Sequence, residues 1–233
     1  KNTLEVISEP RWIEEICSGI GEQLTGLAQM VSHQATTKDD VLYEFTDRRV
    51  TYDVAAWNIQ RISQCKIELC FEQNYDLMAL TELGDRPHDA WEFGLKYPGR
   101  IMCSDPSLPT DPAAGAAILL SARMAKLVIT WESHGTRIVW VRLRGADYNT
   151  IFVSVYVPHK YRACPSQAET LQELETLCRM LQHRFPKDQL IVSGDMNAKL
   201  TRNVQNLTGR YCMHYYSDSG GERLMELIAH TNL

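Results

Sequence analysis

Acid and amide side chains stand at the ends of three apolar stretches of this chain. The three junctions are residues 52–57 into Asn58, 77–81 into Glu82, and 190–194 into Asp195 and Asn197. If the stretches are strands, their polar ends can meet at one sheet edge. Carboxylate and amide oxygens gathered there suit a hard cation such as Mg²⁺. The sequence therefore indicates an enzyme domain.

The elements that position these side chains follow from the apolar periodicity of the sequence. Strands are predicted over 50–58, 76–82, 100–103, 116–120, 126–131, 137–143, 151–157 and 189–193, and helices over 62–73, 166–184 and 222–230. Ser166 and Glu169 have the spacing of a capping box, and Pro186 ends the helix that they begin. Helices interspersed with short neighbouring strands predict an α/β (α+β) fold, a four-layer α-β-β-α sandwich of two mainly antiparallel sheets.

A polar stretch before residue 50 predicts a domain boundary. The chain has 233 residues, of which 44% are hydrophobic, enough for one core of ordinary size. We expect an N-terminal extension over 1–49, partly helical and partly linker. Gly19, Gly21 and Gly26 weaken its helical pattern. The catalytic domain is then expected over 50–233.

Net charge and cysteine content restrict the classes of function and the cellular compartment that fit this sequence. A formal net charge of -5 argues against a protein that holds nucleic acid mainly by overall positive charge, so a site for a polyanion must be locally basic. The seven cysteines are odd in number and contain no CxxC pair, which predicts reduced core thiols and an intracellular location. No apolar stretch has the length of a membrane span, so we expect no membrane partner.

Four motifs, in this order, resemble the endonuclease/exonuclease/phosphatase superfamily, which includes DNase I, apurinic endonucleases and inositol phosphatases. They are Trp57-Asn58-Ile59, Leu80-Thr81-Glu82, Tyr156-Val157-Pro158 and Gly194-Asp195-Met196-Asn197-Ala198. Residues 115–121, 208–210 and 221–227 are more narrowly similar to the endonuclease domain of non-LTR retrotransposons. The resemblance implies a metal-dependent endonuclease that nicks DNA for reverse transcription. It is also compatible with a covalently linked reverse transcriptase domain in the full-length protein.

The residue types and the resemblance together give each side chain a role. Glu82, a hard oxygen donor at a strand end, is assigned as a metal ligand, and by resemblance Asn58 supports the metal and the phosphate. Asp195 by resemblance orients and deprotonates the attacking water. Asn197 is expected on the same side of an extended chain, where its amide fixes water or phosphate. The hydroxyl of Tyr156 is expected to hydrogen-bond the phosphate or to stabilise the transition state. The expected ion is Mg²⁺, with Mn²⁺ as the alternative.

The sequence departs from the family pattern in two places. Gln60 stands where apurinic endonucleases place an aspartate, so a second carboxylate ligand is missing at that position. The retrotransposon subgroup tolerates an amide there. The family also closes with a Ser or Thr, an Asp and a His that nothing before Leu233 matches. We therefore expect a domain that is incomplete at its C-terminus and weak or inactive as this chain.

Two basic clusters follow the polar strand ends. They consist of His159, Lys160 and Arg162 after the first, and Lys199 and Arg202 after the second. Cations at these positions are expected to contact DNA phosphates and to supply the local positive charge that the overall composition lacks, although each cluster also fits a solvated loop. A DNA target implies access to the nucleus, but the sequence contains no import signal.

Two other functions stay open at this stage. One is a phosphatase of the same superfamily that acts on a small phosphate ester. The other is a non-catalytic, degenerate remnant that at most binds nucleic acid or a partner. Nicking of supercoiled plasmid distinguishes the endonuclease from both, because a phosphatase ignores plasmid and a remnant binds DNA without cleaving it.

Overall fold

A computed structural model describes residues 52–84, 99–105, 114–159, 166–202 and 214–233, which belong to one compact unit, Asp47–Leu233. The predicted extension over 1–49 lies outside the described residues. In chain order the described elements are β1 (Val54–Asn58), α2 (Gln64–Glu72), β2 (Leu77–Thr81), β3 (Arg100–Cys103), β4 (Ala116–Leu120), α3 (Ala122–Ala125), β5 (Val128–His134), β6 (Ile138–Leu143), β7 (Thr150–Tyr156), α4 (Gln167–Arg184), β8 (Gln189–Asp195) and α5 (Ser219–Thr231). None of the helices among them is long and apolar enough to cross a membrane.

Two four-stranded sheets each contain one parallel pair of strands. The first has the order β1-β2-β4-β3 and the second β5-β6-β7-β8. Strands β1 and β2 are parallel, as are β7 and β8, and the other four pairings are antiparallel. Parallel neighbours require a crossover connection, and helices α2 and α4 provide it. The prediction of two mainly antiparallel sheets is therefore confirmed.

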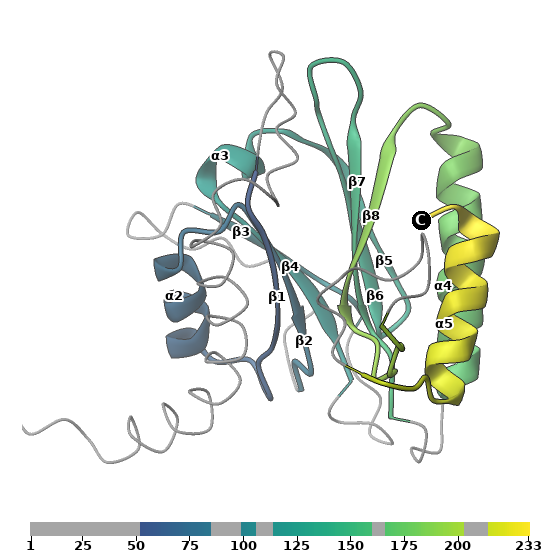
Figure 1. The fold of residues 1–233 in the computed structure, drawn as a ribbon. Helices are drawn as coiled ribbons and strands as arrows, with labels where there is room; N and C mark the ends of the chain where they lie inside the picture. Colours follow the sequence, from purple (N-terminus) through teal and green to yellow (C-terminus); the bar gives the residue numbers. More distant parts are fainter. Residues whose placement is uncertain (1–51, 85–98, 106–113, 160–165, 203–213) are drawn as a thin grey trace, which may run out of the picture. The chain divides into compact units, whose positions relative to one another are not determined.

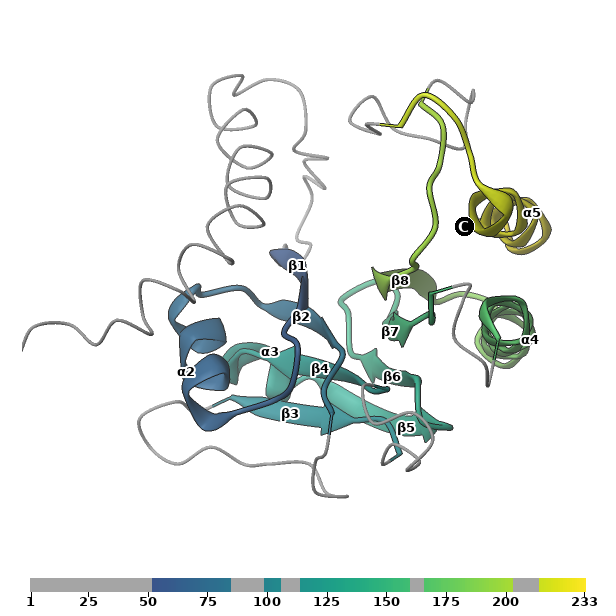
Figure 2. The same ribbon diagram turned by 90° about the horizontal axis from the view of Figure 1, so that it is seen from below.

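The sheets stack face to face, with helices on both outer surfaces (Figures 1 and 2). One apolar cluster lies between the two sheets, and it includes Ala79, Ile118 and Phe152. A second cluster lies between the first sheet and α2, and a third between the second sheet and helices α4 and α5. Because successive residues of a strand face opposite sides, each inner strand contributes to two of these clusters. The observed layers confirm the predicted four-layer sandwich.

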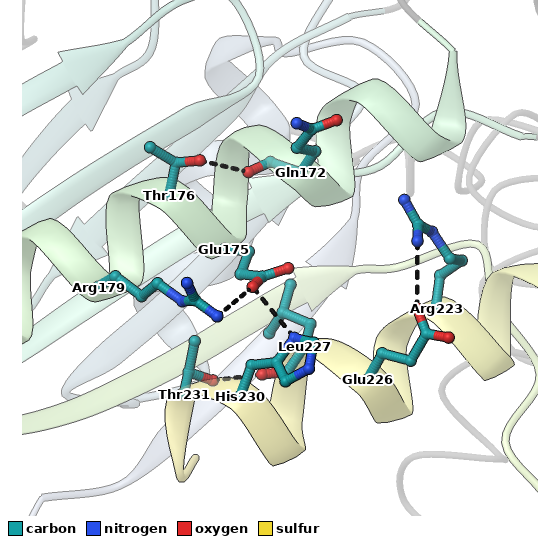
Figure 3. Close-up of polar contacts among 9 residues, drawn as sticks. All are labelled: Gln172, Glu175, Thr176, Arg179, Arg223, Glu226, Leu227, His230 and Thr231. Carbon is teal, nitrogen blue, oxygen red and sulfur yellow. Dashed lines mark hydrogen bonds and ion pairs between the residues drawn. The ribbon is translucent and has the colours of Figure 1, made fainter.

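Helix α4 begins with the predicted capping box. The hydroxyl of Ser166 accepts from the backbone N–H of Glu169, and the Glu169 carboxylate accepts from the N–H of Ser166. Polar contacts on the outer surface then join α4 to α5 (Figure 3). Glu175 pairs with Arg179 on its own helix and with His230 of α5, at 2.8 and 3.2 Å. Such exposed pairs contribute little free energy, so apolar packing accounts for the docking of α5.

Two differences from the sequence-based boundaries concern the polar strand ends. Strand β2 ends at Thr81, so Glu82 lies just beyond the sheet with a positive φ of 57°. Strand β8 was expected to end at residue 193, but it continues to Asp195 because the parallel pairing with β7 extends that far.

The short helix α3 was not predicted. Its four residues are capped by Ser121 and are too few for a helical period to be visible.

Candidate active site

The parallel strand pairs bring the candidate residues to one end of the two sheets, the lower end in Figure 1. In the first sheet Asn58 is the register partner of Thr81, and Glu82 follows directly. In the second sheet Tyr156 is the register partner of Asp195. Register partners of parallel strands point to the same face of the sheet, so Tyr156 and Asp195 are adjacent, while in the first sheet Glu82 comes one residue after the partner of Asn58.

Two hydrogen bonds connect these pairs across the sheets. The amide of Asn58 donates through Nδ2 to Oδ2 of Asp195 at 3.0 Å. The Tyr156 hydroxyl donates to Oε1 of Glu82 at 3.2 Å. Together with the pairing of β7 with β8 and the position of Glu82 directly after β2, these bonds connect four side chains at the ends of β1, β2, β7 and β8. We call this set, Asn58, Glu82, Tyr156 and Asp195, the four-residue ring.

A turn after β1 holds the Glu82 side of the ring. Gln60 and Arg61 both have positive φ, and the N–H of Arg61 donates to the backbone oxygen of Glu82 at 2.6 Å. The ammonium of Lys66 donates to the backbone oxygens of Ile59, Gln60 and Arg61 at 2.5, 3.0 and 3.2 Å. Burial lowers the pKa of Lys66 below its ordinary value. Backbone in this region of φ, ψ space is energetically unfavourable, and such strain concentrates at functional sites.

Both carboxylate oxygens of Asp195 are hydrogen-bonded. Oδ2 accepts from Asn58, and Oδ1 accepts from the backbone N–H of Asn197 at 3.0 Å. Gly194 precedes this aspartate with φ 139°, and a Cβ there would overlap the backbone oxygen of Val155 on the neighbouring strand. The Gly-Asp sequence therefore lets β8 approach β7 closely and fixes the carboxylate at the strand end.

Asn197 corrects one expectation. It was expected to follow Asp195 on the same side of an extended chain, but its φ is 44°, so the chain turns at this residue. Its side chain donates through Nδ2 to the backbone oxygen of Val157 at 2.9 Å, while Gln167 of α4 donates to its backbone oxygen at 2.7 Å. Asn197 thus ties the end of β8 to the end of β7 and supports Asp195 through its backbone.

Arg137 is a residue that the sequence analysis missed. It directly precedes β6, is only 2% exposed, and carries its guanidinium carbon 5.3 Å from the ring centroid of Tyr156. The backbone N–H of Tyr156 also donates to the backbone oxygen of Arg137 at 2.9 Å. A buried cation is therefore packed against the ring whose hydroxyl contacts Glu82. No motif marks this arginine, because an arginine before a strand is most often solvated.

Comparison with solved structures shows which known structures have a similar fold. The structure is similar to the endonuclease domain of TRAS1, a telomere-specific non-LTR retrotransposon, with a TM-score of 0.50 and 18% identity over 77% of this chain and 72% of that one. It is also similar to the AP endonuclease LMAP from Leishmania major, with a TM-score of 0.51 and 17% identity over 79% and 67% of the two chains. The chain has the DNase I-like fold of the endonuclease/exonuclease/phosphatase superfamily. No protein-family model matches the sequence.

Two curated proteins are similar to this chain in amino-acid sequence. Both are named craniofacial development protein 2, from Bos taurus and Tragulus javanicus, and they are 24% and 23% identical over 190 residues. These matches cover 78% of this chain but only 30% and 31% of the relatives. The chain therefore spans less than a third of the length of the relatives that it matches.

The oxygen atoms of the ring residues are of the kind that binds a hard metal ion such as Mg²⁺. Within the described residues, no group of three or more His, Cys, Asp or Glu side chains is placed to bind a metal. Mg²⁺ does not need such a cage, because it is usually held by one or two carboxylates together with water and substrate phosphate. Glu82 is half-buried at the sheet end and Asn58 lies beside it, and both supply hard oxygen. The donor set suits Mg²⁺ better than a soft metal.

Three of the five basic residues predicted to contact phosphate lie in the described part of the chain. Lys199 and Arg202 are exposed in the segment that follows β8, and His159 is exposed shortly after the end of β7. All three thus lie beyond strand ends that carry ring residues. Lys160 and Arg162 lie outside the described residues, so their predicted contact with phosphate stays a prediction.

Proposed function

We propose that this chain is a Mg²⁺-dependent phosphodiesterase domain that nicks DNA. The four-residue ring carries the proposal, because it joins two carboxylates, an amide and a phenol from the ends of four strands, at one end of the two sheets. A structural aspartate or glutamate needs no such partners from the opposite sheet. The DNase I-like fold supports the reaction class, and the oxygen donors support the choice of metal.

Each ring residue has a task that its contacts suit. Glu82 and Asn58 would hold Mg²⁺, which when bound neutralises negative charge on the phosphoryl oxygens. Asp195 accepts the proton of the attacking water, and the two hydrogen bonds to its carboxylate hold it in a fixed orientation for that role. The Tyr156 hydroxyl donates to Glu82 in this structure, and with substrate bound the same O–H would donate to the phosphate instead.

The finer proposal is an endonuclease of the retrotransposon type. It is supported by the segments that resemble non-LTR retrotransposon endonucleases, and by the structural similarity to the endonuclease domain of TRAS1. Such an enzyme leaves a 3′ hydroxyl from which reverse transcription starts. A linked reverse transcriptase domain and access to the nucleus belong to this proposal, as do the phosphate contacts of His159, Lys160, Arg162, Lys199 and Arg202.

Plasmid nicking tests the proposed function directly. Supercoiled plasmid is incubated with the chain in Mg²⁺, in Mn²⁺ or in EDTA, and open circles are quantified on a gel. We expect weak nicking in Mg²⁺ and none in EDTA. Glu82→Gln should reduce nicking by at least about 100-fold, because an amide is a poor ligand for Mg²⁺, while the Tyr156 hydroxyl can still donate to the amide oxygen and the fold is retained.

Glu226→Gln is the matched control for this experiment. It makes the same chemical change on the exposed surface of α5, where Glu226 pairs only with Arg223 in Figure 3, and it should leave nicking unchanged. If the wild type does not nick while p-nitrophenyl phosphate is hydrolysed, the site is a phosphatase instead. If neither substrate is cleaved by the folded chain, the catalytic proposal is wrong.

A further inference from the structure

An exposed group of aromatic and basic side chains lies beside the end of β8. Tyr215 and Tyr216 are 78% and 63% exposed, more than any other large hydrophobic side chain among the described residues. The guanidinium carbon of Arg202 lies 4.1 Å from the ring centroid of Tyr215, and the ammonium of Lys199 lies 5.6 Å from that of Tyr216. We call these four residues the tyrosine platform.

Backbone contacts build the platform from two short segments. The N–H of Arg202 donates to the backbone oxygen of His214 at 2.9 Å, and the N–H of Asp218 donates to the backbone oxygen of Lys199 at 3.2 Å. The Asp218 carboxylate in turn accepts from the N–H of Lys199 at 3.1 Å and from Gly221 at 2.8 Å. The two tyrosines are therefore held in place at the surface by the protein backbone around them.

The platform is near the four-residue ring. Lys199 follows Asp195 by four residues, so their Cα atoms are at most about 14 Å apart. Both segments lie at the same lower end of Figure 1 as the carboxyl end of β8. A polymer held at the ring can therefore continue onto the platform.

We propose that the tyrosine platform binds unpaired nucleotides of the DNA next to the cleaved phosphate. This inference rests on the proposed function for the position of that phosphate. Each tyrosine has a cation against its ring and is otherwise mostly exposed, so a ring face remains open for a base. Stacking on exposed aromatic side chains combined with basic contacts to the backbone is how proteins hold single strands.

The positive charge of the platform and the accessibility of unpaired bases together favour single-stranded DNA as its ligand. The chain has a formal charge of -5, yet the platform presents two cations beside two aromatic rings, which complements phosphate and base at once. In a regular duplex the base faces are covered by their neighbours and cannot stack on a tyrosine. The platform therefore selects a strand whose bases are unpaired, either a single-stranded tract or a frayed end.

Fluorescence anisotropy in EDTA tests the inference without cleavage. The probes are a labelled 12-nucleotide oligo-dT, a labelled hairpin duplex, and an abasic strand of the same length. We expect the wild type to bind oligo-dT more tightly than the abasic strand. The double variant Tyr215→Ala/Tyr216→Ala should bind oligo-dT at least about tenfold more weakly, with duplex binding changed less than twofold.

Two control variants separate stacking from other effects. Tyr215→Phe/Tyr216→Phe keeps the ring faces and should bind oligo-dT as the wild type does. Met180→Ala removes exposed apolar surface from α4 and should change nothing. Equal weakening for all three probes, or no weakening for oligo-dT, would overturn the proposal. Because binding is read without metal, a wild type that binds as expected but never nicks plasmid refutes the proposed function and leaves the platform supported.

Discussion

At the scale of single residues, hydroxyl groups on β7 reach the opposite sheet at two positions. The Tyr156 hydroxyl donates to the carboxylate of Glu82, and the Ser154 hydroxyl donates to the backbone oxygen of Leu80 at 3.5 Å. Both side chains are fully buried or nearly so, and both lie on the face of β7 that looks toward the first sheet. They differ in what they contact, since only one of them contacts a ring residue.

This difference gives a matched pair of variants. Tyr156→Phe should reduce nicking by about 10- to 100-fold, because the hydrogen bond to the phosphate is lost while the ring still fills its place beside Arg137. Ser154→Ala should leave nicking within twofold of the wild type. Each variant should lower the free energy of unfolding by only about 1 kcal/mol, measured by urea denaturation. Equal nicking by the two variants would contradict the role given to Tyr156.

At the scale of secondary structure, one buried carboxylate joins three elements at the end of the sheet opposite the ring. Asp76 directly precedes β2, and its carboxylate accepts from the backbone N–H of Asp53 before β1 and from the hydroxyl of Ser121 before α3, each at 3.0 Å. Its ion-pair partner is Arg123 on α3. Burial raises the pKa of Asp76, but the hydrogen bonds from Arg123, Asp53 and Ser121 outweigh that effect and hold it below its ordinary value of 3.8.

Asp76→Asn should therefore destabilise the domain in a pH-dependent way. A lowered pKa means that the ionised form is favoured in the folded state, so its contribution is present above about pH 4 and is lost as the pH falls through the folded pKa. We expect the variant to lose about 1–3 kcal/mol of unfolding free energy at pH 7, and to lose less at pH 3, where the unfolded carboxyl is already protonated. Urea denaturation at both pH values measures this, and a constant difference between them would contradict the role of ionisation.

The sequence predicts elements better than it predicts the site. Apolar periodicity identifies every described strand and helices α2, α4 and α5, because each buries a regular face over several residues. The turn at Asn197 and the position of Arg137 beside Tyr156 depend instead on where β7 and β8 meet and on how β6 approaches them. Such contacts join residues far apart in the chain, and local periodicity does not contain them.

At the scale of the whole domain, the ring depends on how the layers pack. Its two cross-sheet hydrogen bonds exist only while the sheets stay stacked on the cluster between them. The edge strands β1 and β8, which carry Asn58 and Asp195, are only half-buried along most of their length. The geometry of the ring therefore depends on the packing of both sheets, rather than on one sheet alone.

Two buried thiols can report on whether the layers unfold together, because they lie in different outer layers. Cys70 of α2 belongs to the cluster between that helix and the first sheet, and Cys178 of α4 belongs to the cluster that α4 and α5 form with the second sheet. Burial raises the pKa of each thiol to about 12, so neither is nucleophilic in the folded state, whereas Cys65 is exposed. Unfolding restores an ordinary thiol pKa to both and opens them to reagent.

We expect iodoacetamide to label Cys65 without denaturant, and to label Cys70 and Cys178 over one shared range of urea concentration. Mass spectrometry of the tryptic peptides follows each site separately. A shared range means that both outer layers unfold together with the sheet–sheet core. Labelling of one buried thiol at clearly lower urea would show that its layer opens independently. The ring residues would then be held together by an assembly that comes apart in stages, contrary to the cooperative packing on which the proposed site depends.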